Sequence, residues 1–225
     1  MHSAIRLVSH VDFPKFKNRQ LYMAGMSLKT LSKQGLGAYE PLVRTMMDCV
    51  DIRGSDRFFV TIDEKLVGRG QTHRRGGAHI DGNWLEIKAG WDTPGEWTTA
   101  PGRWENDGQW AMGTPDTKPR LQAGGQWPFI PGGPPWGYNM DLGGMLIASN
   151  EAASVAWRGE LDGLPGEGGD CEHLRDQFDG LTAIPLLSNR VYLTNSTCVH
   201  ESLPVQNPVR RQLIRITLPH DMKVL

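Results

Sequence analysis

The chain of 225 residues is long enough for one large domain and short for two full ones. Hydrophobic residues make up 39% of it and charged residues 22%, which excludes wholesale disorder. The 24 Lys and Arg residues nearly cancel the 25 Asp and Glu residues, giving a net charge of -1. This balance disfavours a dedicated nucleic-acid-binding or membrane-surface protein, so we expect no duplex nucleic-acid partner and no membrane partner.

The same composition gives an expected compartment. No run approaches the ~18 apolar residues of a membrane span, and residues 1–20 lack the apolar core of a secretory signal. The three cysteines, Cys49, Cys171 and Cys198, are widely separated and odd in number, which argues against a disulfide framework or a zinc ribbon. We therefore expect a cytoplasmic protein; the oligomeric state is open.

The first 55 residues are predicted to form a helical support. Apolar residues from Leu21 to Leu31 have helical spacing, and a second set from Leu42 to Val50 follows Pro41, a residue that suits a first helical turn. Gly35 and Gly37 separate the two sets. The pattern predicts two helices.

A long insertion is predicted over residues 90–143. Residues 90 to 144 contain 12 glycines and 8 prolines with little periodicity, together with six of the eight tryptophans. This is too much aromatic surface for a solvated linker. Two interpretations are open: the loop packs on itself, or it stacks a substrate as a lid.

Short β-like runs surround the insertion. They lie at residues 57–62 and 78–81 before it, and at 144–148, 154–157, 190–194 and 210–218 after it, with one short helix expected at 171–178. Helices followed by many short strands indicate a mostly β fold, a sandwich or barrel with helical packing on one side.

The most informative local feature is the pair His79 and Asp81. Residues i and i+2 of a strand point to the same face, so an imidazole and a carboxylate would lie side by side, as two ligands of a divalent metal do. Alone, the pair is more often a hydrogen-bonded surface or turn pair. His200, at the end of another β-like run, offers a third ligand. Two histidines and one carboxylate leave three positions of an octahedral iron open, as in non-haem Fe(II) oxygenases.

Two arginines follow His200 on a strand. Arg211 and Arg215 are four residues apart and therefore share a face, with Leu213 between them. Two guanidinium groups beside a metal call for an anionic ligand, for which a metal-bound dicarboxylate is suited. Arg210 is on the opposite face from Arg211, so only one of these two can point inward.

These residues, in this order, resemble the Fe(II)- and 2-oxoglutarate-dependent dioxygenases over residues 56–219. The resemblance implies a double-stranded β-helix, a jelly-roll or cupin-like core, in a single domain spanning 1–225. It implies that His79, Asp81 and His200 bind iron. It also implies that an arginine of the last core strand binds 2-oxoglutarate: Arg211 and Arg215 by the spacing of the taurine dioxygenase branch, or Arg210 by that of other branches.

The resemblance also bears on the reaction. Related halogenases have a small residue in place of the carboxylate, so Asp81 implies hydroxylation, with formation of succinate and CO2 from 2-oxoglutarate and O2. The expected substrate is a small molecule or an amino-acid-like group, contacted by Trp84, Asn83 and Arg158.

Two other functions stay open on the sequence. One is a cupin-type non-catalytic ligand-binding module, and the other is a zinc-dependent hydrolase with the same three ligands. Four other histidines, His10, His73, His173 and His220, are interpreted as ordinary surface or hydrogen-bonded side chains, and the His73-Arg74-Arg75 run as a solvated charge cluster in preference to an anion site.

Overall fold

The computed structural model describes residues 1–52, 57–81, 84–86, 103–104, 110–111, 136–138, 142–219 and 222–224. The chain divides into two units, one formed by residues 1–83 and 141–225 and the other by residues 84–140. The second unit covers most of the predicted insertion.

Within the second unit, two short antiparallel pairs are described. β6 (Trp84–Glu86) pairs with β9 (Trp136–Tyr138), and β7 (Arg103–Trp104) pairs with β8 (Trp110–Ala111). The two interpretations of the tryptophan-rich loop, a self-packed loop or a substrate lid, concern side chains outside the described residues.

The first unit is mostly β, as predicted, and its sheets are antiparallel. The larger sheet has six strands in the order β2-β13-β10-β15-β5-β3. Their bounds are β2 (Ile5–His10), β13 (Arg190–Asn195), β10 (Leu142–Ser149), β15 (Val209–Pro219), β5 (Arg57–Val67) and β3 (Gln20–Ser27).

A smaller sheet is built around β11 (Ser154–Glu160). This strand pairs with β1 (His2–Ser3), β12 (Thr182–Pro185) and β14 (His200–Ser202). His79 extends the sheet through isolated bridges to His200 and to Asp170. A separate pair joins β4 (Val50–Ile52) to β16 (Met222–Val224).

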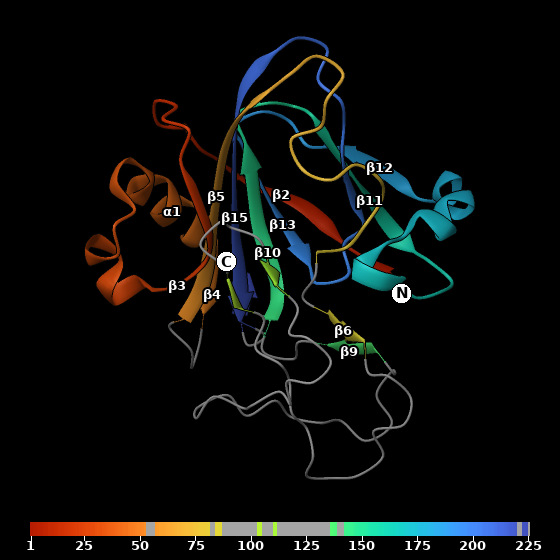
Figure 1. The fold of residues 1–225 in the computed structure, drawn as a ribbon. Helices are drawn as coiled ribbons and strands as arrows, with labels where there is room; N and C mark the ends of the chain where they lie inside the picture. Colours follow the sequence, from red (N-terminus) through yellow and green to blue (C-terminus); the bar gives the residue numbers. More distant parts are fainter. Residues whose placement is uncertain are drawn as a thin grey trace. The chain divides into compact units, whose positions relative to one another are not determined.

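The two faces of the larger sheet are covered differently. Helical segments η1 (Leu28–Lys33), η2 (Gly37–Tyr39) and α1 (Glu40–Met47) cover one face, where Val43 and Met46 of α1 pack in one apolar cluster with Ile214 and Ile216 of β15. β11 and β12 lie on the opposite side, facing the other surface of the sheet (Figure 1). Among the described residues, no helix is long and apolar enough to cross a bilayer.

The prediction of a helix from residue 20 was wrong, because residues 20–27 form β3, hydrogen-bonded to β5 along its edge. The pairing shifts register between Leu21 and Ala24, where Met23 has a positive φ of 44°. This irregularity breaks the alternation of two that marks a strand, so the apolar residues take on helix-like spacing. The strands β1 and β2 also contradict the prediction that residues 1–55 form a helical support. The helices of this segment lie within residues 28–47.

The other predicted elements mostly hold. The runs at 57–62, 144–148, 154–157, 190–194 and 210–218 all lie within strands. The run at 78–81 contributes only the bridges at His79. The predicted helix at 171–178 is a 3-10 helix, η4 (Glu172–Gly180), preceded by the short η3 (Glu167–Gly169).

Candidate metal centre

The three predicted ligands converge between the sheets. His79 and His200 are bridge partners on adjacent segments of the smaller sheet, and Asp81 lies two residues beyond His79. One ligand atom from each of His79, Asp81 and His200 lies within 4.8 Å of the others. The imidazole rings are 4.6 Å apart between centroids, and His200 Nε2 is 3.5 Å from Asp81 Oδ2.

Backbone carbonyls fix which nitrogen of each imidazole faces the centre. His79 Nδ1 lies 2.7 Å from the carbonyl oxygen of Gly77, and His200 Nδ1 lies 3.0 Å from that of Cys198. A carbonyl can only accept, so each neutral ring carries its proton on Nδ1 and has a lone pair on Nε2. Histidines that bind metals are oriented in this way, and the donor set therefore fits a divalent metal.

The charges around the centre favour ligand protonation states that bind metal. Burial alone would raise the pKa of Asp81, but Arg215, which donates to Oδ1, and the two histidines hold that pKa well below its ordinary value. Burial and the neighbouring His200 lower the pKa of His79 to about 4. At neutral pH the site thus offers an ionised carboxylate beside a neutral imidazole, as metal binding requires.

Gly77 gives the His79 segment its geometry. Its φ of +83° is in the left-handed region that favours glycine, and its carbonyl is the acceptor for His79 Nδ1. A Cβ at this position would lie 3.1 Å from Glu172 Oε1. A side chain here would therefore disturb the turn that orients His79.

A second polar site lies on the same face of β15 as Arg215, which contacts Asp81. Arg211 is 0% exposed and donates hydrogen bonds to three serine hydroxyls, from β10, β14 and β11: Ser149 at 3.2 Å, Ser202 at 3.2 Å and Ser154 at 2.8 Å. Among the described residues, no carboxylate lies within ion-pair distance of its guanidinium group. Burial lowers the pKa of Arg211 to about 10. A buried cation held by neutral hydroxyls is a natural place for an anion.

The neighbouring arginine has the opposite environment. Arg210 is exposed, and its guanidinium group lies over the ring of Phe16, 5.8 Å from the centroid. The two arginines lie on opposite faces of the strand, as the sequence predicted, and the structure shows that Arg211 is the one that points inward.

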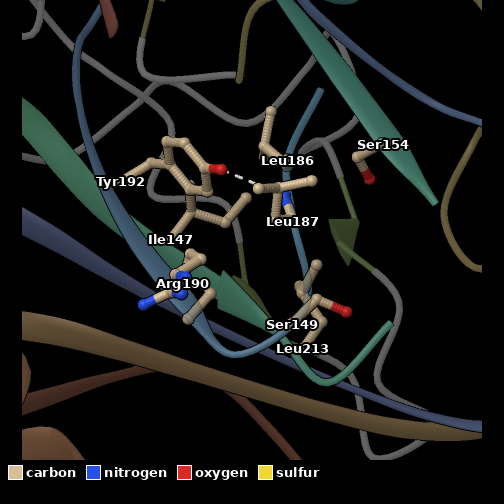
Figure 2. Close-up of a pocket in the computed structure, with 9 residues that line it drawn as sticks. Ile147, Ser149, Ser154, Leu186, Leu187, Arg190, Tyr192 and Leu213 are labelled. Carbon is tan, nitrogen blue, oxygen red and sulfur yellow. Dashed lines mark hydrogen bonds between the residues drawn. The ribbon is translucent and has the colours of Figure 1, made fainter. Parts of the chain in front are cut away.

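A cavity adjoins the Arg211 site (Figure 2). Two of the serines that hold Arg211, Ser149 and Ser154, line it together with Leu213 of β15. Figure 2 shows Tyr192 closing one side through a hydrogen bond between its hydroxyl and the backbone N–H of Leu187. The volume, about 10 Å³, corresponds to one water molecule. A larger ligand at Arg211 therefore requires side chains to move.

The predicted substrate residues, Trp84, Asn83 and Arg158, stay predictions. Arg158 is exposed on β11. Trp84 begins β6 in the second unit, and Asn83 lies outside the described residues.

Sequence reasoning missed a buried ionic cluster. His73, predicted to be an ordinary side chain in a solvated run, is buried with its Nε2 3.2 Å from Asp63 Oδ1, and Arg74 NH1 lies 3.2 Å from Asp63 Oδ2. The available signal was Asp63 itself, a carboxylate inside the apolar run of β5.

Comparison with protein-family models, with curated proteins and with solved structures gives no match.

Proposed function

We propose that the chain is an Fe(II)- and 2-oxoglutarate-dependent oxygenase. It hydroxylates a small molecule or an amino-acid-like substrate and forms succinate and CO2. One observation carries the proposal: the face of β15 that meets the three-ligand centre of His79, Asp81 and His200 also bears Arg211, a buried cation with no carboxylate within ion-pair distance among the described residues. The first group suits a divalent metal, and the second suits the far carboxylate of a dicarboxylic acid.

The connectivity supports a double-stranded β-helix. Segments that follow one another along the chain switch between the sheets: β5 is in the larger sheet, residues 78–81 adjoin the smaller, β10 is in the larger, β11 and β12 in the smaller, β13 in the larger, β14 in the smaller and β15 in the larger. Two sheets built from such alternating segments are typical of a jelly roll. This winding accounts for two metal ligands, His79 and His200, being far apart in sequence and adjacent in space.

The residues divide the work as follows. His79, Asp81 and His200 would hold Fe(II), which supplies the activation of O2 for oxidation. Arg215 keeps Asp81 ionised and fixes the carboxylate by donating to Oδ1. Arg211 and its serines would bind the carboxylate remote from the metal. The Cα atoms of Arg211 and Arg215 are about 13 Å apart along β15 at the usual rise per residue. Leu213, between the two arginines, would contact the carbon chain of the co-substrate.

The test is anaerobic addition of Fe(II) and then 2-oxoglutarate, monitored by the weak visible charge-transfer band of the chelate. The band is expected with the wild-type protein and with Arg210→Met, and is lost in Arg211→Met. A band that stays in Arg211→Met would assign the carboxylate to another residue. Metal binding without any band would overturn the oxygenase in favour of a zinc-dependent hydrolase or a metal-bearing cupin-type module.

A further inference from the structure

A network of side chains joins the two segments that carry the histidine ligands. The carboxylate of Glu172, at the start of η4, accepts a hydrogen bond from the backbone N–H of Ala78, the residue before His79. Arg175, one turn later, donates to Glu172 with Nε 3.1 Å from Oε2, and its NH1 donates to Glu201 Oε2 at 2.9 Å. Glu201 directly follows His200. Arg175 therefore connects the His79 segment, through Glu172, with the His200 segment, through Glu201.

The guanidinium group of Arg175 is itself held in place. It lies 5.4 Å from the ring centroid of Trp157 and 5.1 Å from that of Phe178, and these two rings are 4.6 Å apart. The backbone N–H of Trp157 donates to the carbonyl of Val199, the residue before His200, at 3.0 Å. The connection is thus anchored to the strand beside the ligands.

Few other backbone hydrogen bonds hold the His79 segment, although Ala78 and Ile80 on either side of His79 are buried. His79 and His200 exchange two backbone hydrogen bonds, of 3.0 and 2.9 Å, and the residues on either side of His79 bond only to the 169–171 turn among backbone partners of the described residues. Since no regular strand contains His79, side-chain contacts from η4 supply constraints that a ladder of strand pairs would otherwise give.

We propose that Arg175 is a positioning residue of the metal centre, which keeps the His79 and His200 segments in the spacing that metal binding needs. This proposal rests on the proposed metal centre and adds a determinant of its affinity that does not touch the metal.

The sign of the effect separates positioning from simple electrostatics. Arg175 carries a positive charge, which repels a divalent cation. If Arg175 acted through its charge alone, its removal would leave metal binding unchanged or tighten it. If it positions the ligands, removal weakens binding, and groups outside the ligand set typically change metal affinity about 10- to 100-fold.

The experiment is a titration of the full chain with Co(II), measuring affinity by the visible spectrum of the bound ion, with urea unfolding of each apoprotein run in parallel. Arg175→Ala is expected to bind Co(II) at least about 10-fold more weakly. Arg175→Lys keeps the charge but cannot bridge two carboxylates, so it is expected to bind nearly as weakly. Glu201→Gln is the second variant, for the case that Arg175→Ala fails to fold. It keeps the shape of the Glu201 side chain but removes its negative charge and weakens its hydrogen bond from Arg175.

The matched control is Arg44→Ala. Arg44 also pairs with a carboxylate on its own helix, donating to Glu40 from Nε at 3.0 Å and NH2 at 2.8 Å, and its change should leave Co(II) affinity unaltered. Equal or tighter Co(II) binding by Arg175→Ala and Arg175→Lys would overturn the positioning role of Arg175 and leave the assignment of the metal centre intact. Failure of the wild-type protein to bind Co(II) would instead overturn the metal centre.

Discussion

The two faces of the six-stranded sheet have opposite characters, although they are made by alternate residues of the same strands. On β15, Ile214 and Ile216 are 0% exposed within the apolar cluster beneath the helical layer. Arg211 and Arg215 project from the other face, toward the smaller sheet. Apolar burial stabilises the fold, whereas buried charges cost free energy unless they are compensated. The outer face therefore carries the larger apolar cluster, whereas the inner face combines a smaller one, which includes Ile147 and Leu213, with the candidate chemistry.

Neighbouring carboxylates on β5 repeat this contrast. Glu64, on the outer face, accepts hydrogen bonds from the Tyr39 hydroxyl and from Gln212, both at 2.8 Å. Asp63, on the inner face, lies within ion-pair distance of His73 and Arg74, but its Oδ1 and both ring nitrogens of His73 are buried with no hydrogen-bond partner among the described residues. Glu64 on the outer face is thus satisfied by the protein itself, while the inner face retains unsatisfied polar atoms at Asp63, His73 and Arg215, as binding sites do.

The largest effect is expected from removing a metal ligand on the inner face. His200→Ala takes away one of three protein ligands and should reduce divalent-metal affinity by more than about 100-fold, a larger loss than changes outside the ligand set produce. Its urea unfolding midpoint as apoprotein should change little, because His200 is not part of the apolar cluster. Equilibrium dialysis with Co(II) measures the affinity. Retained stoichiometric binding would contradict the assignment of His200.

The reverse pattern is expected from the outer face. Ile214→Ala leaves a cavity in the cluster under α1 and should lower the free energy of unfolding by about 2–5 kcal/mol. Metal affinity of the folded fraction should match that of the wild-type protein, because the side chain points away from the ligands. Urea denaturation followed by Co(II) titration in native buffer checks both. A large loss of metal affinity in the folded protein would show that the two faces are not independent.

The sequence predicted those features that depend on local periodicity and spacing. The strands at 57–62 and 210–218 and the placement of Arg210 and Arg211 on opposite faces follow from alternation, and residue type and order indicate His79, Asp81 and His200 as candidate ligands. β3 was missed because its bulge at Met23 interrupts the alternation, and because its structure depends on pairing with β5.

The rest of the candidate site depends on contacts that no local pattern encodes. Ser149, Ser154 and Ser202 come from three strands and meet only because those strands converge on Arg211. Arg175 likewise has a role only through the return of η4 to the ligand segments. Neither a single serine nor an arginine in a helical segment indicates, from the sequence alone, that its side chain will be part of such a site.

Arg211→Met tests the inner face in two directions at once. Loss of the guanidinium group should weaken 2-oxoglutarate binding at least about 30-fold, the usual cost of removing one partner of a buried charge pair. The apoprotein should become equally or more stable, by up to about 2 kcal/mol, since a buried cation that has no ion-pair partner in the described part of the chain is replaced by an apolar side chain. Arg210→Met, on the exposed side of the strand, is the matched control and should alter neither quantity. Calorimetric titration and urea unfolding measure them, and a strongly destabilised Arg211→Met protein would mean that the serines suffice to compensate the charge.

Glu64→Gln probes the satisfied carboxylate of the outer face, where the smallest effect is expected. Burial would raise the pKa of Glu64, but hydrogen bonds from the backbone N–H groups of Arg19 and Lys17, at 2.7 and 2.6 Å, hold it below its ordinary value of 4.5. The unfolded chain therefore binds more protons than the folded one as the pH falls past that value. The stabilising contribution of Glu64 is fully present above about pH 5 and is lost progressively below it.

Glu64→Gln should consequently cost about 1–2 kcal/mol at pH 7 and progressively less as the pH falls below about 4.5, because the wild-type carboxylate takes up a proton in that range. Urea unfolding curves of both proteins across this range give the difference directly. A difference in unfolding free energy that stays constant with pH would mean that the loss of stability comes from the shape of the amide and not from the missing charge. Because Gln212 bonds to Glu64 and lies between Arg211 and Leu213, a weakened Arg211 site in the same variant would show that the outer face also fixes the register of the inner one.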